Sequence, residues 1–532
     1  MIHPARGRRG IAVAPHALAS QSALAVLRDG GNAVEAMVAA AATIAVVYPH
    51  MNGIGGDSFW LMSLEGAGGR QVLGVEGCGA AAAAVRRDQY SGSAIPFRGP
   101  PAAITVAGTV SAWERSLTLS REKLGGRLPL SRLLADAIDY ARHGVPVTAS
   151  QHRNTAGKHD ELLGVPGFAD AFLQGGSVPP VGALFLQPRM AATLEQLVHA
   201  GLRDFYAGDL ANSMAADLQA LGSVLALDDL ERHSAVDRKP LVLEHSLASV
   251  YNMPPPTQGL VSLMILGLMD RLAISRGDPL GAGYVHSAVE SAKCAFRVRD
   301  AHLTDPAHMR VDPASFLQPA LLDNLATGID TRHASPWGAG KGPADTVWLG
   351  VIDGAGNAVS MIQSIYHEFG SGVVLPQSGV NWQNRGASFS LDAGHINVLA
   401  PGKKPFHTLN PAMALLRDGR RMVYGNMGGD GQPQSQSAVF TRTVVHGMNP
   451  QEAISAPRWL LGRTWGQTSD SLKLEARFPA ATIDGLRELG HEVEILGDFD
   501  EACGHAGCLL RHPDGTLEGG ADPRSDGAAV AY

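Results

Sequence analysis

The sequence predicts an α+β fold, because the helical patterns lie in its first two thirds and most of the predicted buried strands lie in its last third. Of its 532 residues, 45% are hydrophobic and 17% are charged, a balance typical of a chain that buries a sizeable core. The longest apolar run, residues 36–47, spans 12 residues and stops at Tyr48 and Pro49. A bilayer span needs about 20 residues, so this run predicts a buried helix.

Two helices are expected at the start of the chain. Ser20 or Ser22 is placed to cap a helix that stops at the glycines 30–31. Asn32, with Glu35 three residues later, forms a capping box that opens the apolar helix. Beyond it the pattern predicts a glycine turn at residues 52–57, a strand at 58–62 and helices at 130–142, 191–200, 213–221 and 286–301.

The last third of the chain predicts strands. Residues 346–352 and 358–365 are expected to form a hairpin of buried strands around a turn at 353–357. Residues 332–345, directly upstream of this hairpin, are rich in Gly, Pro and Ala and are the best candidate for an exposed, cleavable segment. Further strands are expected at residues 413–416, 422–424 and 508–511.

Charge and composition exclude several classes of partner. The chain has 43 Lys and Arg against 50 Asp and Glu, and the resulting net charge of −7 argues against a protein that coats nucleic acid. The amino-terminal residues lack the apolar core of a signal peptide, and no run is long enough to span a membrane. Four cysteines do not make a disulfide framework. A cytoplasmic location is therefore expected.

The usual signatures of cofactor and metal chemistry are missing. No P-loop, dinucleotide-binding, zincin or nucleophile-elbow motif occurs, so the chain is expected to work without a cofactor or a metal. Cys503, His505 and Cys508 have the wrong spacing for a zinc knuckle. Cys78 and Cys294 are expected to be small buried hydrophobic residues.

Two candidates for catalytic chemistry remain. His367 and Glu368 could act as an acid–base pair, but a structural polar pair is the favoured interpretation. Thr346 begins a predicted strand, and its hydroxyl is a weak nucleophile that needs a base. A cut just before Thr346 would free its α-amine, whose pKa of about 7.7–8.0 suits that role. Glycines 428–429 can present N–H groups to an oxyanion. From spacing alone, the structural interpretation is favoured over the catalytic one: Thr346 as an ordinary strand start and glycines 428–429 as an ordinary turn.

Ten stretches of the chain, taken in order, match the pattern of a known family. They lie at residues 17–21 (ALASQ), 30–34 (GGNAV), 49–56 (PHMNGIGG), 107–113 (AGTVSAW), 254–256 (PPP), 296–306, 356–360 (GNAVS), 369–372 (FGSG), 428–429 (GG) and 520–525 (GADPRS). Together they make the sequence similar to the γ-glutamyltransferase family of N-terminal nucleophile hydrolases, and the resemblance covers nearly the whole chain. Counting back from residues 356–359 aligns the family's nucleophilic threonine with Thr346.

The resemblance implies a four-layer αββα sandwich made as one precursor, which cuts itself between Asp345 and Thr346. The products would be a large chain, residues 1–345, and a small chain, residues 346–532, which stay together as a heterodimer. Whether two such heterodimers associate is left open.

The resemblance also implies a role for several residues. Thr346 would attack an amide carbonyl, and water or an acceptor amine would resolve the acyl-enzyme. Ser364 falls where the family has a hydroxyl residue that positions the nucleophile. Gly428 and Gly429 match the glycines that bind the oxyanion.

The positions that bind the glutamyl group depart from the family pattern. Family members hold the α-carboxylate with an arginine and the α-ammonium with an aspartate. No arginine occurs in residues 73–83, where it is expected, and the aspartate position falls on Ser388. The remaining positions of the glutamyl site fall on Tyr366, Arg385, His407 and Thr408.

These departures predict a different substrate. The means of binding an ammonium is lost, while Arg385 adds a guanidinium that forks well onto a carboxylate. We therefore expect a hydrolase for small anionic amides that carry a carboxylate but no α-amino group, with Tyr366, Ser388, His407 and Thr408 at the substrate beside Arg385. The alternative is that Arg385 is a structural ion-pair partner.

Residues 363–372 and 382–386 resemble the branch of the family that hydrolyses oxamate, a small amide with an adjacent carboxylate and no amine. Oxamate is therefore the first candidate substrate. γ-Glutamyl hydrolysis or transfer is an alternative, as is the hydrolysis of glutaryl amides or cephalosporins, which needs a longer pocket. A non-catalytic binding protein is disfavoured, because Thr346 and the glycines 428–429 are all present.

Overall fold

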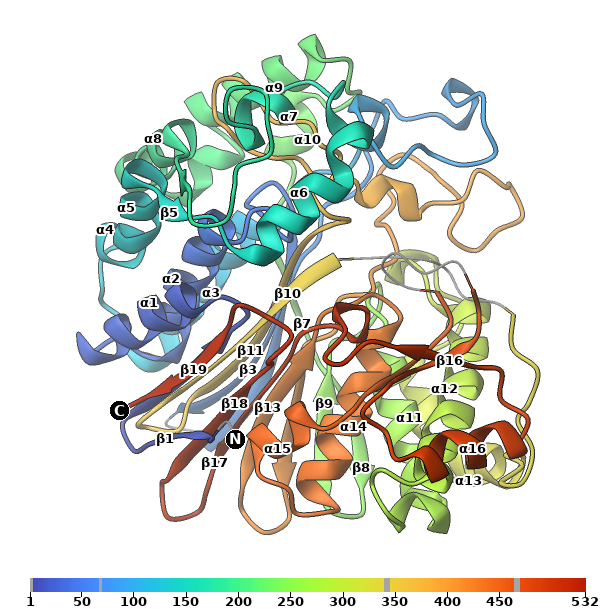
Figure 1. The fold of residues 1–532 in the computed structure, drawn as a ribbon. Coiled ribbons are helices and arrows are strands. Elements are labelled where there is room, and N and C mark those ends of the chain that lie inside the picture. Colours follow the sequence, from blue (N-terminus) through green and yellow to red (C-terminus); the bar gives the residue numbers. More distant parts are fainter. Residues whose placement is uncertain (1–2, 67–68, 339–344, 464–468) are drawn as a thin grey trace.

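Two seven-stranded antiparallel sheets lie face to face between two layers of helices in the computed structural model, which describes residues 3–66, 69–338, 345–463 and 469–532 (Figure 1). One, which we call the β13 sheet, has the order β1 (Ala5–Gly7), β18 (Leu517–Ala521), β17 (Ala506–Arg511), β13 (Arg421–Asn426), β12 (Ala412–Leu416), β9 (Ala248–Asn252) and β8 (Leu241–His245). The other, the β10 sheet, has the order β19 (Ala528–Ala531), β2 (Gly10–Ala14), β10 (Asp345–Asp353), β11 (Ala358–Tyr366), β3 (Asp57–Gly66), β4 (Gly69–Gly77) and β7 (Val236–Arg238). The αββα sandwich implied by the resemblance is confirmed.

Each sheet has its own helical layer (Figure 1). The β10 sheet carries α1 (Ala17–Arg28), α2 (Ala33–Val47) and α3 (Thr109–Leu124), with α5 (Ala135–His143) and α8 (Pro188–Ala200) packed outside them. The β13 sheet carries α11 (Gly259–Arg271) and α14 (Gly431–Val444), with α12 (Ala282–His302) outside α11. Apolar side chains fill the space between each sheet and its helices and between the two sheets. No helix in the described ranges combines the length and the apolar character needed to cross a bilayer.

Shorter elements complete the fold. The remaining helices are α4 (Leu130–Leu133), α6 (Ala149–Leu162), α7 (Phe168–Phe172), α9 (Asp209–Ala220), α10 (Leu227–Glu231), α13 (Pro319–Thr327), α15 (Pro450–Ser455) and α16 (Ala480–Glu488). Two small sheets pair β14 (Trp459–Leu461), β15 (Leu472–Glu475) and β16 (Val493–Leu496), and β5 (Val145–Pro146) with β6 (Leu184–Phe185). The helices and strands predicted from the sequence all coincide with observed elements, although residues 130–142 are divided between α4 and α5.

Both sheets combine strands from either side of residue 345. In the β10 sheet, β10 and β11 lie between β2 and β3. In the β13 sheet, β18, β17, β13 and β12 lie between β1 and β9. Neither region completes a sheet without the other, so residues 1–345 and 346–532 build one fold.

The amino-terminal helices show where the sequence signal succeeds and where it fails. The capping box of α2 is present: the N–H of Asn32 donates to Oε2 of Glu35 at 3.0 Å, and Oδ1 of Asn32 accepts the N–H of Glu35 at 3.2 Å. The predicted cap of α1 is wrong, because the helix begins at Ala17 and His16 is its cap. Ser20 lies inside the helix and donates to the carbonyl of Ala528, a contact that local sequence does not reveal.

Trp348 of β10 sets the spacing between the two sheets. Its indole lies over Gly425 of β13 and Gly507 of β17, where any Cβ would overlap the ring. Two residues further along β10, Gly350 lies against Leu509 of β17. The β10 strand therefore runs along β13 and β17 in a fixed register. Two residues before Trp348, toward the start of β10, the same register brings this strand to the carboxyl end of β13.

Replacing Gly425 with alanine should destabilise the protein by about 1–3 kcal/mol, because the added methyl group overpacks a filled core. The measurement is the midpoint of thermal unfolding at one scan rate. Gly157→Ala is the matched control: Gly157 lies within α6 with open space around it, so this change should raise the midpoint by removing a helix-interior glycine. Equal midpoints for Gly425→Ala and the unmodified protein would contradict the packing of Trp348.

Candidate active site

Thr346 lies in β10 where the pairing with β11 is interrupted. The ladder shifts register between Asp345 and Val347, which leaves Thr346 opposite a β-bulge that contains Ser364. Bulges re-aim side chains and are common next to active sites. The Thr346 side chain is buried, and its Oγ1 donates a hydrogen bond to Oγ of Ser364 at 3.3 Å.

Ser364 connects Thr346 to Tyr366. The Oγ atom of Ser364 also accepts the backbone N–H of Tyr366 at 2.8 Å. Tyr366 has a φ of 84°, a left-handed conformation that is strained for a bulky side chain and that is retained mainly at functional sites. In this conformation the ring centroid of Tyr366 lies 4.0 Å from Cζ of Arg385.

Arg385 is fully buried, and no carboxylate of the described residues is in contact with it. Among the residues that the structure describes, none of its three guanidinium nitrogens has a hydrogen-bond partner. Burial lowers the pKa of this guanidinium, but an arginine remains charged at physiological pH. Within the described ranges the structural ion pair that was the alternative explanation of Arg385 is not formed. Its N–H groups are therefore available to an anion.

Asp57, Cys78 and His407 form a buried cluster, called here the Asp57 cluster, on which the charge of Arg385 acts. The Nε2 atom of His407 lies 3.0 Å from Sγ of Cys78 and 3.3 Å from Oδ2 of Asp57. Burial lowers the pKa of His407 well below its usual range, and the charge of Arg385 lowers it further. The imidazole is therefore neutral at pH 7. Cys78 is buried in the core between the sheets, as expected, and its thiol also contacts this imidazole.

Asp57 should make the stability of the protein fall as the pH rises. Burial raises the pKa of its carboxyl from 3.8 to about 7, so between these values the folded protein holds a proton that the unfolded chain releases. Folding is then favoured at the low end of this window, and stability is lost toward about pH 7 by at most about 1.4 kcal/mol per pH unit. Asp57→Asn imitates the protonated carboxyl, so the melting temperature of the variant minus that of the unmodified protein should increase from pH 5 to pH 8. A difference that does not change with pH would contradict this assignment.

The glycines predicted to bind an oxyanion lie in the turn between β13 and α14. The φ angles of Gly428 and Gly429 are 111° and 52°, which glycine adopts without strain. The turn leads into the N-terminus of α14, where the helix dipole favours negative charge. The register set by Trp348 brings the start of β10, which carries Thr346, to this end of β13.

Gln258 joins the glycine turn to the predicted substrate residues, and no motif in the sequence indicates a role for it. Its Nε2 donates to the carbonyl oxygens of Gly429 and Thr408, both at 2.9 Å. Nη1 of Arg299 contacts Oε1 of Gln258 at 3.3 Å and Oδ1 of Asp430 at 2.7 Å. Arg299 lies within residues 296–306, one of the stretches that match the family pattern. That match is the sequence feature that could have indicated a role for Arg299 and its partner Gln258.

The two remaining predicted substrate residues differ in their surroundings. Ser388 is half-buried, and its hydroxyl donates to the carbonyl of Arg385 at 2.9 Å, so it shapes the turn that carries the guanidinium. Oγ1 of Thr408 is buried and has no hydrogen-bond partner in the part of the chain that the structure describes. It is available to a ligand in the same way as the guanidinium.

Two other sequence candidates border this arrangement, and the ring of His367 lies edge-on to that of Tyr366 at 4.4 Å. The carboxylate of Glu368 is 3.8 Å from both Arg98 and Lys158, and the ring of His367 stacks on that of Phe97 at 4.6 Å. These contacts agree with the structural interpretation of both residues. Of the segment predicted to be exposed, residues 332–338 are partly exposed, while residues 339–344 lie outside the described residues.

Metal-ligand types meet at two places among the described residues, in the Asp57 cluster and at His286, Glu290 and His491. In the first, the positive charge of Arg385 opposes a divalent cation. In the second, Nδ1 of His286 is hydrogen-bonded to Nε2 of His491 at 2.8 Å, and Glu290 binds Lys293 at 2.6 Å. Both sets of ligands are therefore engaged, and function without a metal stays a prediction. Cys503 and Cys508 are buried, and Cys294 is half-buried.

The chain as a whole is similar to several known proteins. A model of the family described as Gamma-glutamyltranspeptidase matches residues 19–532. The oxamate amidohydrolase proenzyme of Klebsiella pneumoniae subsp. pneumoniae is 59% identical over 525 residues, which cover 98% of each chain, and the glutathione hydrolase-like YwrD proenzyme of Bacillus subtilis is 42% identical with the same coverage. The crystal structure of cephalosporin acylase from Bacillus halodurans has a TM-score of 0.90 at 31% identity and covers 100% of this chain and 97% of its own.

Proposed function

The chain belongs to the gamma-glutamyltranspeptidase family and is an enzyme that hydrolyses amides, and from this premise we propose that it acts on a small anionic amide, oxamate foremost, with Thr346 as the nucleophile. The proposal rests on one observation above others, the buried and unpaired guanidinium of Arg385 beside Tyr366. An unpaired buried charge is costly, and a substrate carboxylate that forks onto it would remove that cost.

Maturation is part of the proposal. The chain would cut itself between Asp345 and Thr346 and leave residues 1–345 and 346–532 as a heterodimer. The interleaving of strands from both regions in each sheet supports this, because the two chains would stay together without a covalent link. The names of the two relatives at 59% and 42% identity, both proenzymes, also support it.

The proposed reaction uses the new α-amine of Thr346 as its base. The amine accepts the hydroxyl proton while Oγ1 attacks the amide carbonyl carbon, and the N–H groups of Gly428 and Gly429 stabilise the oxyanion. The C–N bond breaks, the proton passes to the leaving nitrogen, and ammonia departs to leave an oxalyl ester on Thr346. Water then attacks the ester carbonyl and gives a proton to the amine. The ester bond breaks, Oγ1 regains its proton, and oxalate is released.

Neutral groups around Arg385 suit a substrate that has no ammonium. The position of the family's aspartate carries Ser388, whose hydroxyl is committed to the Arg385 carbonyl. The imidazole of His407 is neutral at pH 7, since burial holds its pKa low. A glutamyl α-ammonium would therefore be buried next to a guanidinium that repels it, while the carboxyl of Asp57, whose pKa burial raises to about 7, would be only partly ionised to balance it.

Glutamyl transfer is the second candidate, because the relative at 42% identity is described as glutathione hydrolase-like. Incubation with oxamate, followed by assays of ammonia and oxalate, separates the two. We expect equal amounts of both products, and little release of nitroaniline from γ-glutamyl-p-nitroanilide or glutaryl-p-nitroanilide. Release of nitroaniline stimulated by a dipeptide acceptor, with no ammonia from oxamate, would replace the proposal by the second candidate.

A further inference from the structure

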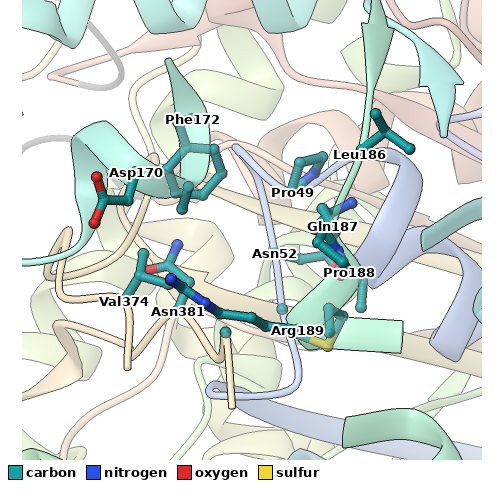
Figure 2. Close-up of a pocket in the computed structure, with 15 residues that line it drawn as sticks. Pro49, Asn52, Asp170, Phe172, Leu186, Gln187, Pro188, Arg189, Val374 and Asn381 are labelled. Atoms are coloured by element: carbon teal, nitrogen blue, oxygen red, sulfur yellow. The ribbon is translucent and has the colours of Figure 1, made fainter. Parts of the chain in front are cut away.

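A separate cavity of about 210 Å³ lies between the helical layer of the β10 sheet and the loop that follows β11 (Figure 2). Its lining comes from the end of α2 and the turn after it, from α7, from the start of α8, and from residues 374–381. None of the residues predicted for catalysis or substrate binding lines it. The volume is below the roughly 300–1,000 Å³ of sites for drug-sized ligands, so it suits a small organic molecule.

One wall of this cavity carries a buried amide without a partner. Asn381 is 7% exposed, and neither its Nδ2 nor its Oδ1 has a hydrogen-bond partner among the described residues. Figure 2 shows the Asn381 side chain at the cavity beside Val374. Buried amides are almost always hydrogen-bonded in native proteins, so this amide has both a donor and an acceptor to offer to a molecule in the cavity.

Positive charge gathers at the same wall. Figure 2 shows Arg189 extending along the cavity toward Asn381. Arg189 is exposed and forms no ion pair with any residue that the structure describes. It belongs to the first turn of α8, a helix of 13 residues whose cap, Gln187, makes no side-chain hydrogen bond to that turn. Guanidinium, amide and helix N-terminus together favour a carboxylate.

The other residues that line the cavity indicate the chemical character of the rest of the ligand. Pro49, Phe172 and Val374 present buried apolar surface, and Leu186 adds to it at the mouth. Asp170 also lines the cavity, and its carboxylate would repel a second negative charge on the ligand. We propose that this cavity binds a small monocarboxylate with an apolar body, such as an arylacetate.

Such a ligand would contact the segment that leads to Arg385. Val374 and Asn381 pair across a turn, and the N–H of Trp382 donates to the carbonyl of Val373 at 2.9 Å. The next residue, Gln383, donates its N–H to the carbonyl of Gly55 at 3.0 Å. Ligand binding would thus restrict the motion of residues 374–383. This effect is expected whatever the enzyme's substrate is, so the proposal does not rest on the proposed function.

The test uses the purified protein, cut or uncut, and phenylacetate as the probe, with isothermal titration calorimetry. We expect a dissociation constant of about 1 mM or below and at least about tenfold weaker binding of 2-phenylethanol, which lacks the carboxylate. Arg189→Gln should weaken phenylacetate at least about tenfold, as should Asn381→Asp, which places a like charge at the same position. Arg87→Gln, an exposed arginine away from the cavity, is the matched control and should change nothing.

Two further measurements separate this cavity from the candidate active site. Arg385→Met should bind phenylacetate as the unmodified protein does, and the ligand should slow amide hydrogen exchange in residues 374–383. No binding at 10 mM phenylacetate, equal affinity in Arg189→Gln, or loss of binding in Arg385→Met would each overturn the proposal.

Discussion

Thr346→Ala should abolish the hydrolysis of oxamate, with a loss of about 10³-fold or more in kcat/KM, because the variant has no hydroxyl to form the acyl-enzyme. Ammonia release is the measurement. Thr346→Ser keeps a hydroxyl and should retain measurable activity. Its rate should nevertheless be lower than that of the unmodified protein. Thr346 is buried opposite a bulge and hydrogen-bonded to Ser364, and its methyl group, which the variant lacks, helps to fix the side-chain rotamer.

Ser364→Ala tests how the hydroxyl of Thr346 is held. Its Oγ accepts both the Thr346 hydroxyl and the N–H of Tyr366, so the change should lower kcat more than it raises KM. Full oxamate hydrolysis by Thr346→Ala would remove this threonine from the mechanism, whatever Ser364→Ala does.

Arg385→Met is expected to change activity and stability in opposite directions. If the guanidinium binds the substrate carboxylate, its removal should lower kcat/KM by about 30- to 150-fold, which corresponds to about 2–3 kcal/mol. The same change replaces a buried charge that has no hydrogen-bond partner among the described residues by an apolar side chain of similar length. The melting temperature should therefore stay the same or rise.

Arg458 provides the matched control for Arg385. It is equally buried, but it forms an ion pair with Asp522, and its Nη2 donates to the carbonyl of Gly504 at 2.7 Å, so its role is structural. Arg458→Met should lower the melting temperature, because it breaks a buried ion pair, with less effect on the KM for oxamate. A lower melting temperature for Arg385→Met with an unchanged KM would show that Arg385 is structural and would remove the basis of the substrate assignment.

Much of the fold could be predicted because its signals are local. The capping box of Asn32 and Glu35 depends on residues three apart, and the hairpin of β10 and β11 depends on two apolar runs around one turn. His16 illustrates the limit, since the serines that resembled a cap make other contacts, one of them to Ala528 at the far end of the chain. Such contacts exist only after the sheets have formed.

The candidate site divides in the same way. Thr346, Gly428 and Gly429 can be predicted from the sequence because they match positions of the family pattern. Arg385 can be predicted because it departs from that pattern at one position. In the Asp57 cluster the pattern indicates His407 but not its partners, because Asp57 and Cys78 come from other segments and neither is unusual alone. Burial then changes their chemistry, as the raised pKa of Asp57 shows. The unpaired amide of Asn381 likewise depends on the neighbours that the fold supplies.

The central claim, a nucleophile freed by self-cleavage, is tested most directly by the intact mass of the purified protein under denaturing conditions, beside Thr346→Ala. Two masses that sum to the full chain plus one water, with Thr346 as a new N-terminus and a single mass for the variant, are the predicted result. A single uncut chain after prolonged incubation, in a preparation that nevertheless hydrolyses oxamate, would contradict the account.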